Sequence, residues 1–225
     1  MTMQRPRIAI LGGTGAEGSG LAVRLARAGY RVTLGSRNPE KAANVCSELN
    51  AIAGGEPIGF LDNRSAAAAA DVVVLTVPHA AQRATVEDVR SELAGKILVD
   101  ATVPLVPPKV SRVQLPDGGS AVAAIQAMLG DPVRVVSAFQ NVSSHALKDV
   151  DRNVDCDVLV CGDDPGAREV VIGLARDIGL RAWHAGPIAN SAAAEALTSV
   201  LIAINIRYKV GGAGIRITGV PDSPA

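Results

Sequence analysis

Aromatic side chains are scarce in this chain, which has two Phe, two Tyr and one Trp among 225 residues. So few rings argue against the modules that bind nucleic acids by base stacking. The chain also lacks an excess of charge of either sign, because 22 Lys and Arg balance 22 Asp and Glu. A net charge of zero leaves no basic footprint for a phosphate backbone. We therefore expect no nucleic-acid partner.

Long apolar runs and paired cysteines are missing as well. Uninterrupted apolar runs fall well short of the roughly 20 residues that a membrane helix needs, and the polar residues 1–7 do not resemble a signal peptide. We therefore expect no membrane association. Cys46, Cys156 and Cys161 have spacings that suit neither a zinc site nor a CxxC pair. We interpret them as small hydrophobic residues of a cytoplasmic protein and expect no bound metal.

What the chain does have is apolar periodicity. Apolar residues make up 48% of the sequence, which is enough to build a core. Short apolar runs alternate with segments of helical spacing, a pattern typical of a parallel sheet covered by helices. We predict strands at 8–11, 31–34, 57–61, 71–77, 96–100, 133–138, 157–161 and 181–184. We predict helices at 16–28, 39–49, 66–70, 85–93, 121–129, 165–178 and 190–209.

The order of these elements predicts an α/β fold, a Rossmann-type doubly wound parallel sheet with a small C-terminal α/β lobe. The pattern changes after Phe139. We therefore divide the chain into a dinucleotide-binding domain at 1–139 and the small lobe at 140–225. Residues 221–225 are predicted to form a frayed tail.

A glycine-rich loop follows the first predicted strand and opens the first predicted helix. Gly13, Gly15 and Gly18 form a G-x-G-x-x-G pattern, which in this position is typical of dinucleotide binding. We predict that Gly13 makes the tight turn, that Gly15 admits the pyrophosphate, and that Gly18 lets the helix pack closely on the strand. The N–H groups at the helix N-terminus would bind the phosphates. The alternative is a structural glycine turn in another kind of α/β protein.

The end of the second predicted strand distinguishes between the two nicotinamide dinucleotides. An NAD site has Asp or Glu about 20 residues beyond the loop, where it binds the ribose hydroxyls, but residues 34–38 contain no acid. The Ser36 hydroxyl and Arg37 guanidinium suit a 2′-phosphate instead, and Lys41 adds a second positive charge. We therefore predict NADP(H). The alternative for Arg37 and Lys41 is that they are ordinary exposed charges.

The segment after the fourth predicted strand consists of Val77, Pro78 and His79. Open α/β sheets bind ligands outside the carboxyl ends of their strands, so we predict that this segment borders the ribose or nicotinamide. His79 is a candidate acid–base group, and a solvated loop histidine is the alternative. No Ser-His-Asp or Cys-His arrangement is evident. Hydride transfer needs no protein nucleophile, because it requires only two rings held together in a water-excluding cleft.

Motifs in both halves of the chain resemble the NADPH-dependent coenzyme F420 reductase family (F420H2:NADP oxidoreductases). The N-terminal half carries the resemblance at residues 10–15 and 34–37. The C-terminal half carries it, more specifically, at residues 158–164, 185–188 and 195–198. The resemblance covers nearly the whole chain.

The resemblance implies hydride exchange between NADPH and the deazaflavin coenzyme F420 in a homodimer. It implies that the C-terminal lobe forms part of the acceptor cleft and the dimer interface. The positions that match NADP-phosphate contacts are Thr14, Ser36, Arg37 and Lys41. The positions that match the edge of the ribose are Val77 and Pro78. The catalytic positions, where the two rings meet, correspond to Gln140, Asn141 and Val142.

Three positions on the acceptor side differ from the family pattern. Gln140 stands where His is common, His79 where an aromatic residue is common, and Ala192 where Arg is common. These differences leave two alternatives beside the leading hypothesis of an NADPH:F420 oxidoreductase. One is an NADPH-dependent reductase of a flavin, carbonyl or imine on the same scaffold. The other is a non-catalytic NADP sensor.

Overall fold

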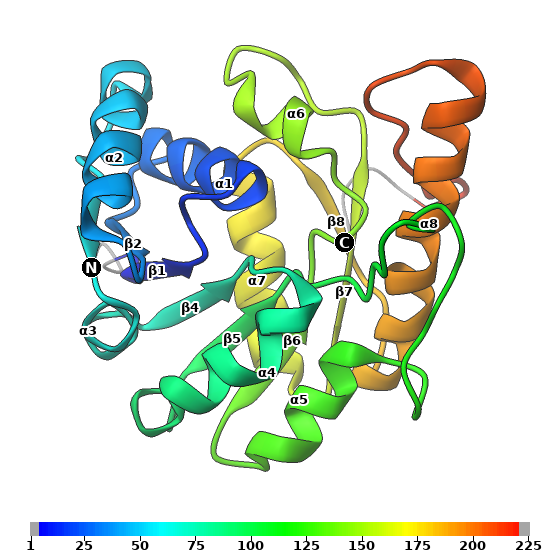
Figure 1. Cartoon of the computed structure of the whole chain (residues 1–225), viewed down its shortest axis with the longest axis horizontal. Helices are drawn as coiled ribbons and strands as arrows, with labels where there is room; N and C mark the ends of the chain where they lie inside the picture. The colour runs from blue at the N-terminus through cyan, green and yellow to red at the C-terminus, as the bar shows by residue number, and fades with distance from the viewer. Residues whose placement is uncertain (1–4, 221–225) are drawn as a thin grey trace.

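A computed structural model describes residues 5–220, in which eight strands form a single sheet (Figure 1). The strand order is β3-β2-β1-β4-β5-β6-β7-β8. All neighbouring strands are parallel except β6 and β7. The strands are β1 Ile8–Leu11, β2 Val32–Gly35, β3 Gly59–Leu61, β4 Val72–Leu75, β5 Ile97–Asp100, β6 Arg134–Ser137, β7 Asp157–Gly162 and β8 Arg181–His184.

Helices cover both faces of the sheet and bury two apolar clusters against it. Helices α1, α2, α6 and α7 contribute to one cluster, and α3, α4 and α5 contribute to the other. The helices are α1 Ala16–Arg27, α2 Pro39–Ala53, α3 Asn63–Ala69, α4 His79–Asp88, α5 Ala121–Leu129, α6 Ser144–Lys148, α7 Pro165–Asp177 and α8 Ser191–Tyr208. Two 3₁₀ turns lie at Arg90–Glu92 and Ile188–Asn190.

The central strands are apolar along their whole length because both of their faces are buried. Every residue of β1 and β4 is buried, as expected for parallel strands between two layers of helices. Side chains one residue apart along these strands enter opposite clusters. The predicted doubly wound fold is confirmed, and its switch point lies between β1 and β4, where the strand order reverses.

One pairing differs from a wholly parallel sheet, since β7 runs antiparallel to β6. The connection between them contains only the five-residue helix α6. At about 1.5 Å per residue, such a helix is too short to carry the chain back across the sheet. The chain therefore turns back at the same edge, and β7 and β8 extend the sheet. The division at residue 139 stays a prediction, and the expected frayed tail at 221–225 lies outside the described residues.

Several elements differ from the predictions, and three of the differences have a clear physical reason. Helix α4 begins at His79, although the sequence pattern predicted a start at Thr85. The earlier start has a local reason, because Ala80, Ala81 and Ala84 are strong helix formers close behind Pro78. Helix α2 extends to Ala53, where Gly54 adopts a left-handed conformation that ends it. Helix α6 was not predicted, because a single turn has too few residues to show periodicity.

By length and composition, the described segment Ile188–Tyr208 could span a membrane. Glu195 interrupts the apolar residues of this segment, so the statement about uninterrupted runs is unaffected, and the absence of membrane association stays a prediction. About a third of the segment is buried in the protein. Helix α8 stands at one side of the molecule, next to the long loop that joins β5 to α5 (Figure 1).

Arg24 of α1 ties the two halves of the chain together. Its side chain is buried, with 8% of its surface exposed. Its Nε donates to the carbonyl of Leu147 at 2.8 Å, and its Nη2 donates to the carbonyls of Ala146, Asp149 and Arg152 at 2.5 to 3.1 Å. The guanidinium thus satisfies carbonyl groups at the end of α6 that would otherwise lack partners.

We expect Arg24→Met to lower the free energy of unfolding by about 3 kcal/mol, because it leaves buried carbonyls unsatisfied while keeping the aliphatic stem. Chemical denaturation measures this loss. Arg27→Met is the matched control, since Arg27 makes only an exposed ion pair with Asp151 at 3.2 Å. We expect this control to cost well under about 1 kcal/mol. Equal effects of the two substitutions would contradict the anchoring role of Arg24.

Candidate functional site

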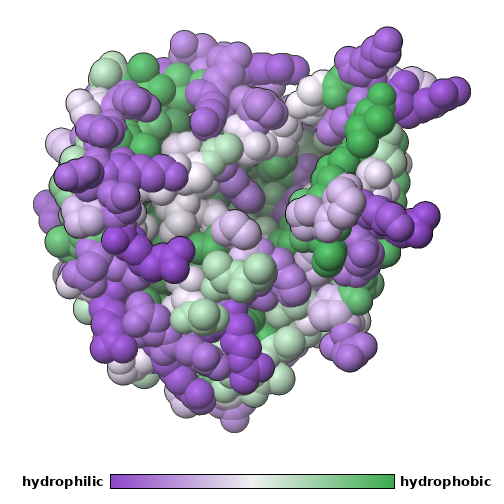
Figure 2. Space-filling model, in the orientation of Figure 1, coloured by the Kyte–Doolittle hydropathy of each residue, from purple (hydrophilic) through white to green (hydrophobic). Residues whose placement is uncertain are grey.

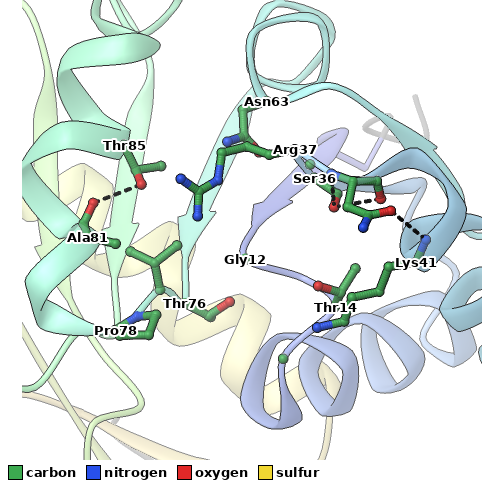
Figure 3. A pocket seen from close by; sticks show the side chains of 14 residues that line it. Gly12, Thr14, Ser36, Arg37, Lys41, Asn63, Thr76, Pro78, Ala81 and Thr85 are labelled. Atoms are coloured by element: carbon green, nitrogen blue, oxygen red, sulfur yellow. Dashed lines mark hydrogen bonds between the residues drawn. The ribbon is translucent and has the colours of Figure 1, made fainter.

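A cavity of about 380 Å³ lies outside the carboxyl ends of β1, β2 and β4. The glycine loop forms its floor, and the turn after β2 and the start of α4 form its walls (Figure 3). Of the predicted cofactor-binding residues, those that line the cavity are Thr14, Gly15, Ser36, Arg37, Lys41, Val77 and Pro78. Those that do not line it are Gly13, Gly18 and His79. The binding roles themselves stay predictions.

The tight turn of the glycine loop contains both Gly12 and Gly13, and the positive φ lies at Gly12. Gly12 has φ = 82°, a value that residues with a Cβ rarely adopt. Its carbonyl accepts a hydrogen bond of 2.9 Å from the N–H of Gly15. Gly13 also serves close packing, because a Cβ there would lie 2.7 Å from Cδ2 of Leu34. Gly13 therefore lies within the predicted turn, and Gly12 supplies the left-handed conformation that the prediction did not include.

Gly18 allows α1 to approach the sheet closely, as predicted. A Cβ at this position would lie 2.5 Å from Oγ1 of Thr76 and 2.7 Å from Cα of Gly13. Helix α1 begins after Gly15, which has no side chain to cap it. Its first N–H groups are therefore available to an anion, and the dipole of this twelve-residue helix favours one there. This cradle fits the pyrophosphate of a dinucleotide.

The turn after β2 presents two cations to the cavity. Ser36 Oγ and Asn38 close the turn with hydrogen bonds of 3.1 Å, and Asn38 caps α2 through the N–H of Lys41. Figure 3 shows the Arg37 side chain extending across the cavity toward α4. Among the described residues, neither the Arg37 nor the Lys41 side chain forms an ion pair or hydrogen bond within the protein. Both charges are therefore free to meet a 2′-phosphate, whereas no carboxylate lies at this point to select NAD.

Asn63 was missed by sequence reasoning. It is the first residue of α3, is 9% exposed and lines the cavity beside Gly35. Its Oδ1 has no hydrogen-bond partner among the described residues. A buried acceptor without a partner indicates a ligand donor, such as an adenine amino group or a ribose hydroxyl. The sequence offers no signal for this role, because Asn after Asp62 resembles an ordinary helix start.

A second polar site lies at the carboxyl end of β5, the strand next to β4, and Asp100 is its central residue. This residue is fully buried at the end of β5. Its carboxylate accepts hydrogen bonds from Gln82 Nε2 at 2.6 Å and from the N–H of Thr102 at 2.9 Å. Burial raises the pKa of Asp100, and the two donors and the nearby His79 oppose that shift. Its carbonyl accepts a hydrogen bond of 2.8 Å from Gln140 Nε2.

The predicted catalytic segment lies in the connection from β6 to α6 and packs against α8. Gln140, Asn141 and Val142 are 5%, 6% and 7% exposed, and none of them lines the cavity described above. Asn141 Nδ2 donates to the carbonyl of Ala194 at 2.8 Å, so its amide is used in holding α8. Oε1 of Gln140 has no partner among the described residues. The segment begins at Phe139, whose φ of 75° is strained for a bulky residue, and such strain is common at functional sites.

His79 and Glu17 are two titratable residues near the starts of α4 and α1, and each interacts electrostatically with Asp100. His79 is the first residue of α4 and is partly exposed, so it is not the loop histidine that was considered. Glu17, in the first turn of α1, was missed although it lies inside the glycine motif. Burial, followed by the charge of Asp100, raises the pKa of Glu17 to about 8. The sequence signal that could have drawn attention to Glu17 is a carboxyl group inside a predicted phosphate-binding loop.

Helix α8 is held by a buried carboxylate at the N-terminus of α5. Glu195 is 1% exposed and accepts hydrogen bonds from Ser120 Oγ at 2.6 Å and from the N–H of Ala121 at 2.8 Å. Burial raises the pKa of Glu195, and the helix donors oppose that shift. The Glu195 carboxylate therefore holds α8 against the N-terminus of α5.

No group of three or more potential metal ligands occurs within residues 5–220, and the three cysteines are buried and unpaired.

The doubly wound sheet, the uncapped glycine loop and the free cations after β2 define the class of NADP-dependent oxidoreductases. Comparison with known families is more specific. Residues 7–104 match the family described as NADP oxidoreductase, coenzyme F420-dependent. The chain is 44% identical to the F420-dependent NADP reductase of Methanothermobacter thermautotrophicus over 96% of both chains. It is 44% identical to that of Methanocaldococcus jannaschii over 95% of this chain and 99% of the relative. The chain therefore belongs to the F420-dependent NADP reductase family.

A solved structure has the same architecture. The crystal structure of a candidate F420-dependent NADP reductase from Arthrobacter sp. FB24 superposes with a TM-score of 0.80 at 25% identity. The superposition covers 95% of this chain and 99% of that chain. The shared fold therefore includes β7, β8 and α8 as well as the cofactor-binding strands.

Arg37→Ala tests the 2′-phosphate assignment. We expect the Kd of NADPH to rise about 30-fold or more, because a charge-assisted hydrogen bond is lost. The Kd of NADH should change less than about threefold, because it lacks the phosphate that Arg37 contacts. Fluorescence titration of the two dinucleotides measures both constants. Lys41→Ala should have the same selectivity with a smaller effect, and equal losses for NADPH and NADH would refute the assignment.

Proposed function

We propose that the protein transfers a hydride between NADPH and coenzyme F420. The observation that carries this proposal is 44% identity to F420-dependent NADP reductases over nearly the whole chain. That length includes the acceptor side at β7, β8 and α8 as well as the cofactor-binding strands. Because the identity extends over the acceptor side, we favour the deazaflavin over a flavin, carbonyl or imine as the acceptor.

We assign the binding groups of the cofactor side as follows. The first N–H groups of α1 hold the pyrophosphate, and Arg37, assisted by Lys41, holds the 2′-phosphate. Val77 and Pro78 border the ribose. When bound, NADPH supplies the hydride, and the protein supplies position and a dry environment. The burial of Gln140, Asn141 and Val142 supports their assignment to the place where the rings meet.

The proposal is tested by following NADPH oxidation by the purified protein with F420 as acceptor. We expect F420-dependent turnover, and no comparable rate with a flavin, a carbonyl or an imine. Turnover with one of those acceptors and none with F420 would establish another reductase. Tight NADPH binding without turnover of any acceptor would establish a sensor.

We further propose that the protein is a cytoplasmic homodimer that assembles through α8. Val200, Ile204 and Tyr208 recur at a spacing of four residues and are 43%, 37% and 71% exposed, and Ile206 is 65% exposed. Figure 2 shows hydrophobic residues gathered along this helix. A contiguous apolar surface of this kind favours a protein partner. A second copy of the chain is the partner we expect, as the family resemblance implies.

Ile204→Asp tests this interface. We expect the substitution to convert a dimer into a monomer, because it buries a charge in an apolar contact. Light scattering after size-exclusion chromatography measures the mass. Val170→Asp on α7 is the matched control, since Val170 is 39% exposed but lies outside α8. A wild-type protein that is monomeric, or that partitions into lipid vesicles through α8, would contradict the proposal.

A further inference from the structure

One polar side chain in the wall of the cofactor cavity has no partner at either end of its amide. Asn63, the first residue of α3, is 9% exposed and lines the cavity. Neither its Oδ1 nor its Nδ2 forms a hydrogen bond with another residue in the described range 5–220. Buried amides are nearly always hydrogen-bonded, because burial without a partner forfeits the hydrogen bonds that water would supply. The unpaired amide therefore indicates a ligand at this wall of the cavity.

The backbone fixes Asn63 beside the end of β2. Strand β3 pairs in parallel with β2, with Leu61 opposite Gly35. The N–H of Ser36 continues this pairing, because it donates to the carbonyl of Leu61 at 3.1 Å. Asp62 then caps α3, since its side chain accepts a hydrogen bond of 3.0 Å from a backbone N–H in the first turn. Asn63 therefore has a defined position, one residue beyond the cap.

Gly35 lets the side chain of Asn63 lie against the end of β2. A Cβ at position 35 would lie 2.9 Å from Oδ1 of Asn63 and 2.5 Å from Cδ2 of Leu11. A larger residue would therefore displace Asn63 from the cavity wall or Leu11 from the core. The absence of a side chain at position 35 thus serves the close approach of Asn63.

The end of β2 is where a dinucleotide-binding fold meets the 2′ position of the adenosine ribose. In an NAD site, a carboxylate at this point accepts hydrogen bonds from the ribose hydroxyls. In this chain Ser36 and Arg37 line the cavity there instead. Figure 3 shows the Asn63 side chain on the same side of the cavity as the Arg37 side chain. The contact of Asn63 with Gly35 therefore favours the ribose over the adenine ring as its partner.

We propose that Asn63 is a further residue that selects NADP(H), with an amide N–H that donates to the 2′-phosphate. This inference rests on the proposed reaction of NADPH. Ionised phosphate oxygens are acceptors, so they match the Nδ2 end of the amide. The neighbouring 3′-hydroxyl can donate, so it matches the Oδ1 end. One uncharged side chain would then bind both substituents of the ribose and assist the cations Arg37 and Lys41.

A carboxylate of nearly the same shape reverses this selectivity. Asn63→Asp keeps an oxygen that accepts from ribose hydroxyls, but it loses the N–H donor and repels the phosphate. We expect the ratio of the Kd of NADPH to the Kd of NADH to rise at least about 30-fold over wild type. Fluorescence titration of the two dinucleotides measures both constants. The ratio removes the contact with the 3′-hydroxyl, which both ligands share.

Asn44→Asp is the matched control. Asn44 is exposed on α2, one turn beyond Lys41, and does not line the cavity. The substitution therefore makes the same change of charge without touching a bound ribose. We expect the Kd ratio to stay within about threefold of wild type, because solvent screens an exposed charge. A control that reproduces the effect of Asn63→Asp would show that long-range repulsion is sufficient, and would overturn the proposal.

Asn63→Ala keeps the proposal testable if a buried carboxylate prevents folding, and thermal unfolding shows which variants fold. We expect Asn63→Ala to raise the Kd ratio about fivefold or more, because NADPH loses a charge-assisted hydrogen bond and NADH loses at most a neutral one. A merely structural role would weaken both dinucleotides equally, since the cavity would be disturbed for either ligand.

Equal losses of NADPH and NADH binding in the Asn63 variants would assign the amide to the adenine ring or to the fold, and would overturn the proposal. An unchanged ratio would do the same. Failure of the proposed function is a separate result, because the ratio is measured without F420 and without turnover. Conversely, F420 turnover by a protein whose ratio does not respond to Asn63 would leave the proposed reaction intact and refute the role of this residue.

Discussion

The buried carboxylate of Asp100 is the interaction on which the two sides of this molecule depend. It lies at the end of β5, between the strands that carry the cofactor and the strands that follow Gln140. Gln82 of α4 binds the side chain of Asp100 and Gln140 binds its carbonyl, so one residue connects α4 to the segment between β6 and α6. A buried charge is costly unless it is hydrogen-bonded, which explains why polar groups converge here. The site is consequently rigid at the point where two rings must meet.

The rest of the acceptor side is built on similar principles. Glu195 binds α8 to the N-terminus of α5, and Arg24 binds the end of α6 to α1. In each case a charged side chain satisfies backbone groups at a helix end. These contacts join segments about 75 to 125 residues apart in the chain, so the small C-terminal helices depend on the cofactor-binding half for their position. The antiparallel pairing of β6 with β7 keeps the connecting segment at the functional edge of the sheet.

Local patterns predicted the fold and identified most of the residues that line the candidate cofactor cavity, because both depend on short-range features. The apolar run of β4 and the glycine motif after β1 are visible in the sequence, and so is the missing acid after β2. The role of Gly12 was not predicted, because φ cannot be read from a row of glycines. Asn63 and Glu17 were missed because their importance comes from burial and from neighbours such as Asp100, which lies 83 residues from Glu17 in sequence. Such contacts exist only after folding.

The distribution of charge now explains how a chain of zero net charge serves an anionic cofactor. Arg37 and Lys41 line the cavity at the turn after β2, where they would meet the 2′-phosphate. The first N–H groups of α1 would meet the pyrophosphate without any charged side chain. Two local cations and one helix N-terminus therefore suffice for an anionic cofactor, and no net excess of positive charge is needed.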